Sequence, residues 1–291
     1  MHQETQLRRR VRRASRGAGT AALVLGSTLA LTLLGAAQAS AAQIRGPLCS
    51  AGSSAAEARH LSRALDTALS SRRGTVGVAF LDLTSGVACD VRGGRHFDSA
   101  SVVKTAILAT LLFETQHRHT SLTASGRALA TAMITHSDNN AASALWQRIG
   151  GASGLRRFLN AAGMTHTIPG AGGMWGLTQI TARDQIRLLS LLATDNSVLT
   201  AASRKYELGL MDRVIAGQRW GAPAGAPRGE TVAVKNGWLP LAPGGWHVNT
   251  TGVGLGRRSY VMAILSDGNP SMGFGVTTVS NVARAINHNV F

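Results

Sequence analysis

Two short segments of this chain carry the residue types needed for serine chemistry. Ser101 begins and Lys104 ends the segment Ser-Val-Val-Lys, and Lys235 begins the segment Lys-Asn-Gly. A serine hydroxyl is a weak nucleophile unless a neighbour removes its proton, and residues three apart lie on the same face of a helix. Lys104 can be that neighbour, because a lysine amine can lose its proton whereas an arginine guanidinium stays charged. These residues predict nucleophilic attack by Ser101 on an acyl group.

The scarcity of lysine supports this interpretation. The chain has three lysines and twenty-seven arginines, and two of the three, Lys104 and Lys235, fall in these motifs. Where a plain charge suffices the chain uses arginine, so these positions indicate a need for an amine. Ser-x-x-Lys alone is equally consistent with a helix-capping serine followed by a chance lysine.

Between these two motifs in the chain, and so the second of three, is Ser137-Asp138-Asn139, which lies between two expected helices. By itself it is also typical of an ordinary N-cap and turn. Lys235 follows the apolar run 232–234, so we expect its amine at the end of a strand, where Gly237 lets a ligand approach the backbone. Three such motifs in this order would rarely coincide by chance.

In order and spacing, the three motifs resemble those of the class A β-lactamase family, and more broadly the active-site-serine enzymes that include penicillin-binding proteins and D,D-peptidases. The resemblance covers about residues 50–290. It implies an α+β fold, in which N- and C-terminal helices flank an antiparallel sheet and an all-helical domain is inserted. Ser101 would be the nucleophile and Lys104 the base that activates it.

The resemblance also assigns roles to the second motif. Ser137 would relay a proton to the leaving nitrogen, and Asn139 would hydrogen-bond the side-chain amide of the substrate. Asp138 would be a buried structural residue at the start of a helix.

The third motif would bind the substrate. Lys235 would hold a substrate carboxylate and tune Ser137, with Asn236 and Gly237 beside it. The backbone N–H groups of Ser101 and Trp238 would form an oxyanion hole. Asn236 departs from the family pattern, in which Thr or Ser is usual at this position.

A larger departure concerns the second chemical step. Family members place a glutamate in a loop between the second and third motifs, where it directs a water onto the acyl-enzyme. Here residues 139–183 contain no Asp or Glu, and the loop is the glycine-rich segment 168–176. Without a general base, worth typically ~10²–10⁴-fold, an acyl-enzyme could form and persist.

Two further residues are candidates for this site. His166 is a titratable group in the loop region, although a solvent-facing histidine is the simpler interpretation because no orienting partner is evident. Arg219 could supply an additional partner for a carboxylate, and a packing or surface role is equally consistent. Trp175 and Trp246 could line the site, although core packing is the default for tryptophan.

The elements that position these motifs follow from local patterns. Ser54 and Glu57 form a capping box before an amphipathic helix, and 75–83 with 87–91 is typical of a β-hairpin. Helical spacing then recurs near 102–113, 125–135, 139–149, 153–162, 181–193 and 200–216, which predicts an all-helical middle. Strands are expected at 231–234, 248–253 and 260–265, and a helix at 277–286. We therefore predict a sheet domain from residues 42–100 plus 226–291 and a helical domain from 101–225.

The first 41 residues have the features of an export signal: clustered arginines, an apolar run from about 21 to 34, and small residues near 39–42. A membrane anchor is the weaker alternative, because the run is short and interrupted. We therefore expect a secreted protein, with cell-wall association open and no stable membrane anchor after cleavage. A lipoprotein is not expected, because no cysteine stands at the cleavage site. The formal net charge of +16 falls to +11 without residues 1–41, which favours retention on anionic wall polymers. Nucleic acid is a poor partner for such a chain.

Both cysteines, Cys49 and Cys89, lie in the exported portion. An oxidising compartment favours a disulfide between them, and two unpaired buried thiols are the alternative. No metal or other cofactor is expected, because the histidines lack ligand spacing. Three functions remain open: a secreted serine hydrolase that opens β-lactams through acyl-Ser101, a D-Ala-D-Ala peptidase or esterase of the same superfamily, and a penicillin-binding sink or sensor that acylates without efficient turnover.

Overall fold

The computed structural model describes residues 48–70, 72–241 and 243–291. The predicted export signal at 1–41 lies outside the described residues. Across these three ranges, no helix is both long and apolar enough to span a bilayer.

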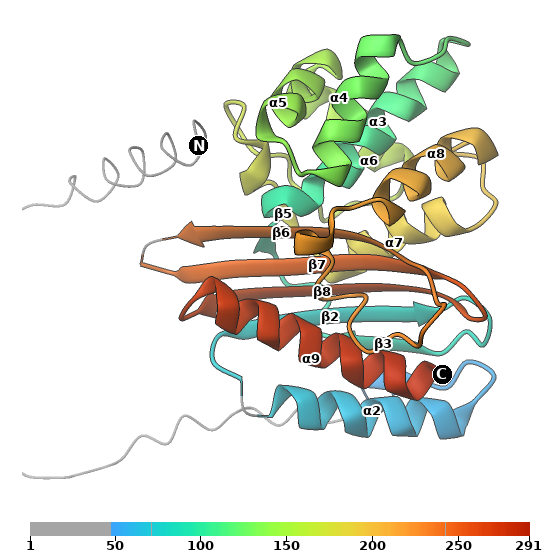
Figure 1. Ribbon diagram of the computed structural model, residues 1–291, viewed down its shortest axis with the longest axis vertical. Helices are drawn as coiled ribbons and strands as arrows, with labels where there is room; N and C mark the ends of the chain where they lie inside the picture. The colour runs from blue at the N-terminus through green and yellow to red at the C-terminus, as the bar shows by residue number, and fades with distance from the viewer. Residues whose placement is uncertain (1–47, 71, 242) are drawn as a thin grey trace, which may run out of the picture. The chain divides into compact units, whose positions relative to one another are not determined.

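An antiparallel sheet joins the two ends of the described chain (Figure 1). Its strands run in the order β1-β3-β2-β8-β7-β6. They are β1 (Cys49–Ser50), β2 (Thr75–Asp82), β3 (Ala88–Val91), β6 (Val232–Leu241), β7 (Gly245–Leu255) and β8 (Ser259–Asn269). The predicted hairpin is confirmed as β2 and β3, and β2 pairs with β8 along its whole length.

Two helices cover one face of this sheet, α2 (Ala55–Leu69) and α9 (Met272–Val290). Each begins at a serine whose hydroxyl accepts a backbone hydrogen bond: Ser54 from Glu57 at 3.2 Å, and Ser271 from Phe274 at 3.1 Å. These caps satisfy donors that a helix start leaves free. Leu61 and Leu65 of α2 are fully buried, as the helical spacing predicts.

The remaining helices lie on the other face of the sheet (Figure 1). They are α3 (Val103–His117), α4 (Ala124–Thr135), α5 (Asn139–Arg148), α6 (Gly151–Ala161), α7 (Ala182–Ala193) and α8 (Ala201–Asp212). Short 3₁₀ turns precede or connect them: η1 (Ala100–Val102), η2 (Trp175–Leu177) and η3 (Ala216–Gln218). Threonine hydroxyls cap the starts of α4, α7 and α8.

The middle of the chain is not wholly helical, which corrects the prediction. Strand β5 (Gln179–Ile180) pairs antiparallel with β4 (Phe97–Asp98), directly before η1. Two residues are too few to show an alternating pattern, so no local signal in the sequence predicts this strand. This pairing ties the glycine-rich loop to the backbone that leads into Ser101.

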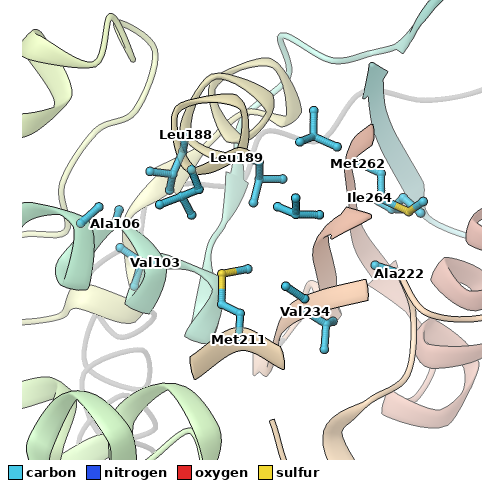
Figure 2. Close-up of a cluster of buried hydrophobic side chains, with 14 of the residues drawn as sticks. Val103, Ala106, Leu188, Leu189, Met211, Ala222, Val234, Met262 and Ile264 are labelled. Carbon is cyan, nitrogen blue, oxygen red and sulfur yellow. The ribbon is translucent and has the colours of Figure 1, made fainter. Parts of the chain in front are cut away.

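A shared hydrophobic core fixes α3 and β6 relative to each other (Figure 2). Val103 of α3 and Val234 of β6 are buried in one cluster, to which α7, α8 and β8 also contribute. Each valine adjoins a lysine in the chain, Lys104 and Lys235. Dense packing of this kind allows little relative movement, so the core holds the two amines in place.

Cys49 and Cys89 form a disulfide that joins β1 to β3. The predicted pairing is therefore confirmed. The division into a sheet domain and a helical domain at residues 101 and 226 remains a prediction.

Candidate active site

Ser101 lies in the first turn after the β4 strand, within η1. The residue before it, Ala100, has a φ of 47°, a left-handed conformation that is uncommon for a residue with a side chain. Backbone hydrogen bonds hold this turn, because Ser99 N donates to Thr178 O at 2.9 Å. The Ser101 side chain is partly exposed, and its Oγ has no hydrogen bond to the described residues. The hydroxyl is thus open to a ligand.

Lys104 lies one helical turn further along, at the start of α3, and is fully buried. Its Nζ lies 2.6 Å from Ser137 O, 3.0 Å from Ser137 Oγ and 2.8 Å from Asn139 Oδ1. The first and second motifs therefore meet at this amine. Ser137 itself has a φ of 57°, so the second motif also contains a left-handed residue.

Lys235 brings the third motif to the same hydroxyl. Its Nζ is fully buried and donates to Ser137 Oγ at 3.0 Å and to Asn236 O at 3.0 Å. Ser137 Oγ consequently lies between two lysine amines, Lys104 and Lys235. The structure places Lys235 inside β6 rather than at a strand end, because the strand continues to Leu241.

Burial is the main influence on both amines. Desolvation lowers the pKa of Lys104 well below its ordinary value, and the nearby charge of Lys235 lowers it further. Desolvation also lowers the pKa of Lys235, to about 7. Neither lysine forms an ion pair with an acid of the described chain.

The partners of Lys104 suit a neutral amine. Ser137 O and Asn139 Oδ1 can only accept hydrogen bonds, so they take the two hydrogens of a neutral –NH₂ group. The lone pair is then left for a hydroxyl, either that of Ser137 or that of Ser101. The lowered pKa favours an amine that can receive a proton, and these two acceptors leave its lone pair available.

Gly237 brings β6 directly against η1. A Cβ atom added at Gly237 would lie 2.7 Å from Ser101 N and 2.8 Å from Val102 N, closer than real contacts allow. On the neighbouring strand, Asn249 pairs with Gly237 in register and donates from Nδ2 to Asp98 O at 2.9 Å and Ser99 O at 3.3 Å. Glycine and asparagine together fix the backbone N–H of Ser101 next to the edge strand that bears Trp238.

The Asn236 side chain points away from Lys235 along the strand alternation. Its Nδ2 donates to Gln218 O and Trp220 O, each at 2.8 Å. Its Oδ1 is buried and has no hydrogen-bond partner in the described residues. The amide donors are therefore occupied by the last residue of η3 and by the segment that follows it.

Two sequence candidates are not brought into the lysine cluster. His166 is exposed, and its ring contacts Thr165 Oγ at 3.2 Å. Arg219 donates to the backbone carbonyls of Asp212 at 2.6 Å and Val232 at 2.9 Å. Asp138 caps α5 by accepting from Ala141 N at 2.7 Å, but it is exposed rather than buried, which corrects the expectation.

The glycine-rich loop places an aromatic ring beside the amine. Trp175 is 3% exposed, its ring centroid lies 5.0 Å from Lys104 Nζ, and its indole N–H donates to Ser143 Oγ at 3.1 Å. The first acid after the loop, Asp184, accepts from His166 N at 2.9 Å and Thr167 Oγ1 at 2.8 Å. That carboxylate anchors the two residues before the loop and does not hydrogen-bond Lys104.

Sequence reasoning gave no site role to Asn249 and left Trp175 with core packing as its default. Asn249 stands in the predicted strand 248–253 beside two other polar residues, Thr250 and Thr251, so the sequence offers no signal that singles it out. For Trp175 the signal was its place in an otherwise small-residue loop, but its partner, Lys104, is 71 positions away in the chain.

Solved structures with similar folds include β-lactamases and a penicillin-binding protein. A β-lactamase from Xanthomonas campestris pv. campestris aligns with a TM-score of 0.69 and 24% identity over 80% of this chain and 98% of that one. A class A β-lactamase from Bacteroides cellulosilyticus gives 0.70 and 16% identity over 79% and 97%, and the structure of PBP-A gives 0.68 and 22% identity over 79% and 94%. The α+β fold predicted from the sequence is therefore confirmed.

The sequence comparison is more specific. The model of the Beta-lactamase enzyme family matches residues 60–125 and 114–290, and the chain belongs to this family. A protein of Mycobacterium tuberculosis named "Putative lipoprotein LppW" is 29% identical over 198 residues, which are 66% of this chain and 63% of that protein. The match thus spans just under two thirds of this relative's length.

Proposed function

We propose that this protein is an active-site-serine hydrolase that opens β-lactam amides through an acyl-Ser101 intermediate. One observation carries the proposal: the hydrogen-bonded series Lys104–Ser137–Lys235 lies one helical turn from a serine whose hydroxyl is open to a ligand. A serine nucleophile needs a base, and a buried amine of lowered pKa supplies one.

In the acylation step, Ser101 Oγ attacks the amide carbonyl and its proton passes to Lys104 Nζ. The C–N bond then breaks, and Ser137 delivers a proton to the leaving nitrogen while it is reprotonated from Lys104. When the Ser137 hydroxyl turns towards that nitrogen, the Lys104 lone pair is free for Ser101. The backbone N–H groups of Ser101 and Trp238 would stabilise the oxyanion, at a junction that Gly237 keeps tight.

Substrate binding would involve residues on both sides of this series. In its protonated form, Lys235 would attract a substrate carboxylate, and Asn139 would hydrogen-bond a side-chain amide of the substrate. Both Nδ2 hydrogens of Asn236 are engaged by backbone carbonyls, so this side chain would support the strand rather than the ligand. Arg219 donates to two backbone carbonyls and would keep further N–H groups for a substrate carboxylate.

Intact-mass analysis with benzylpenicillin tests the proposal. The wild-type protein should gain the mass of the intact antibiotic, and Ser101→Ala should gain none while remaining folded by circular dichroism. Turnover of a chromogenic cephalosporin and of a D-Ala-D-Ala peptide, measured in parallel, distinguishes a β-lactamase from a peptidase. Absence of an adduct and of turnover in the wild-type protein would refute acylation at Ser101.

A second candidate function is a penicillin-binding protein that acylates once and stalls, serving as a sink or sensor. A specific observation favours it: the described residues place no carboxylate in hydrogen-bonding contact with Lys104, and Trp175 lies beside the amine instead. A lasting adduct without turnover is the result expected of this function.

The name of the mycobacterial relative, the sequence features of residues 1–41 and the basic charge together support a location in the cell envelope. There, β-lactams and peptidoglycan-like peptides would be the accessible acyl donors, and anionic wall polymers would retain a basic protein.

A further inference from the structure

Hydrolysis of acyl-Ser101 requires a water molecule next to a base. The water attacks the ester carbonyl and gives one proton to the base, and the C–O bond to Ser101 breaks as the serine oxygen recovers that proton. Lys104 is the base that this site offers, so a hydrolytic water must reach its Nζ.

The surroundings of Lys104 offer a water molecule few hydrogen-bond partners. Three polar atoms, Ser137 O, Ser137 Oγ and Asn139 Oδ1, already lie within 3.0 Å of Nζ. Trp175 presents its aromatic face to the amine at 5.0 Å. An ordered water needs two to four polar partners, and an indole face supplies none.

The tryptophan is held in this position from two sides. Its N–H donates to Ser143 Oγ on α5, so that donor is not free to bind a water. On the other side, Gly176 O accepts from Ser99 Oγ at 3.3 Å, which joins η2 to the backbone just before Ser101. Trp175 is 3% exposed, so its ring is almost wholly shielded from solvent.

We propose that Trp175 is a positioning residue that excludes water from Lys104 and thereby prolongs the life of acyl-Ser101. This inference rests on the proposed acylation of Ser101. On this proposal, deacylation is slow for two reasons: the loop lacks a carboxylate, and the Trp175 ring keeps water away from Lys104. A change at Trp175 should therefore affect deacylation and leave acylation almost unchanged.

The test is a pulse of benzylpenicillin followed by rapid removal of free antibiotic and a time course of intact masses. Trp175→Ala opens space beside Lys104, and Trp175→Gln adds a polar partner for a water while retaining much of the side-chain length. Trp175→Phe keeps the aromatic face and is the matched control. We expect the adduct half-life to fall at least ~10-fold in the Ala or Gln variant, with adduct formation within about threefold of wild type, and no change in Phe.

The outcomes separate the two proposals. A long-lived adduct of equal half-life in wild type, Ala and Gln would overturn the role of Trp175 and leave acylation standing. A wild-type adduct that disappears within seconds would also overturn it, because the ring would then not protect the ester. Absence of any wild-type adduct, together with absence of turnover, would overturn both proposals. If Trp175→Ala does not fold, Trp175→Gln decides the same question.

Discussion

The described chain buries ionisable groups in several places, and two of these places are built in opposite ways. Beneath Ser101, the amines of Lys104 and Lys235 each contact at least two oxygen atoms. In α8, Glu207 is fully buried, and neither of its carboxylate oxygens has a hydrogen-bond partner in the described residues. Desolvation is the largest cause of the pKa shift at all three residues, lowering the pKa of both lysines and raising that of Glu207 well above its ordinary value.

The contrast shows what a shifted pKa does and does not indicate. Burial alone shifts a pKa in either place, so the shift by itself does not identify a reactive group. The lysines differ because their partners converge on one hydroxyl, Ser137 Oγ, and because a nucleophile of the right type lies one turn away. Glu207 has no such neighbours and is best explained as a protonated acid within the helical layer.

Replacement of Lys104 should have the largest effect. Lys104→Ala removes the base, so the second-order rate of adduct formation with benzylpenicillin should fall by ~10²–10⁴-fold. Lys104→Arg should fall as far, because guanidinium keeps the charge and cannot take the proton. Lys205→Ala, on the exposed side of α8, is the control and should match wild type.

The arginine variant is decisive for this prediction. If Lys104→Arg retained the wild-type rate, a positive charge rather than a base would be required at this position. Lys104 would then be a buried cation and not a base, and its partners would not distinguish it from Glu207.

Glu207 should affect stability and not activity. Its pKa is raised in the folded chain, so the folded state holds this proton more tightly than the unfolded state. The free energy of unfolding should be greatest below the ordinary pKa of glutamate and should decrease as pH rises, by up to about 1.4 kcal/mol per pH unit. Glu207→Gln cannot ionise and should remove this slope, so that it exceeds wild type by about 1–3 kcal/mol near pH 8.

Urea denaturation of both proteins at pH 5 and pH 8 measures this difference, with Asp66→Asn on the exposed face of α2 as the control. Parallel pH profiles for wild type and Glu207→Gln would show that Glu207 is ionised in the folded chain. A loss of acylation in Glu207→Gln would instead show that this residue of α8 contributes to the reaction.

The sequence predicted the lysine site better than the loop beside it. Ser101, Lys104 and Ser137 lie in short motifs whose local structure, a helix start and a turn, can be derived from neighbouring residues. The absence of an acid from 139–183 was likewise visible in the sequence. The position of Trp175 was not, because it depends on the β4–β5 pairing and on a contact with a distant helix.

Strand β6 illustrates a second limit. The apolar run 232–234 predicts a strand that ends at Lys235, yet the strand continues through Gly237 to Leu241. Glycine and a proline at position 240 are unfavourable in strands, and here pairing with β7 outweighs that preference. Edge strands accept proline because one side of the strand needs no ladder hydrogen bond, and β6 is the last strand in the sheet order. Local sequence propensity does not reveal that β6 lies at the edge of the sheet.

The smallest effect concerns the charge of Lys235, and it separates the two lysines from each other. The pKa of Lys235 is lowered to about 7, so this amine is protonated below pH 7 and increasingly neutral above it. If its role is to attract a carboxylate, affinity should be high at pH 6 and should fall by roughly tenfold by pH 8. Measuring benzylpenicillin binding to Ser101→Ala by calorimetry removes the chemical step. In the same background, Lys235→Arg stays charged and should bind with little dependence on pH.

A flat profile for Ser101→Ala alone would mean that Lys235 remains protonated or does not meet the carboxylate. Lys235 would then contribute through its hydrogen bond to Ser137. Both buried lysines would in that case serve the proton transfer through Ser137, and neither would bind the substrate carboxylate.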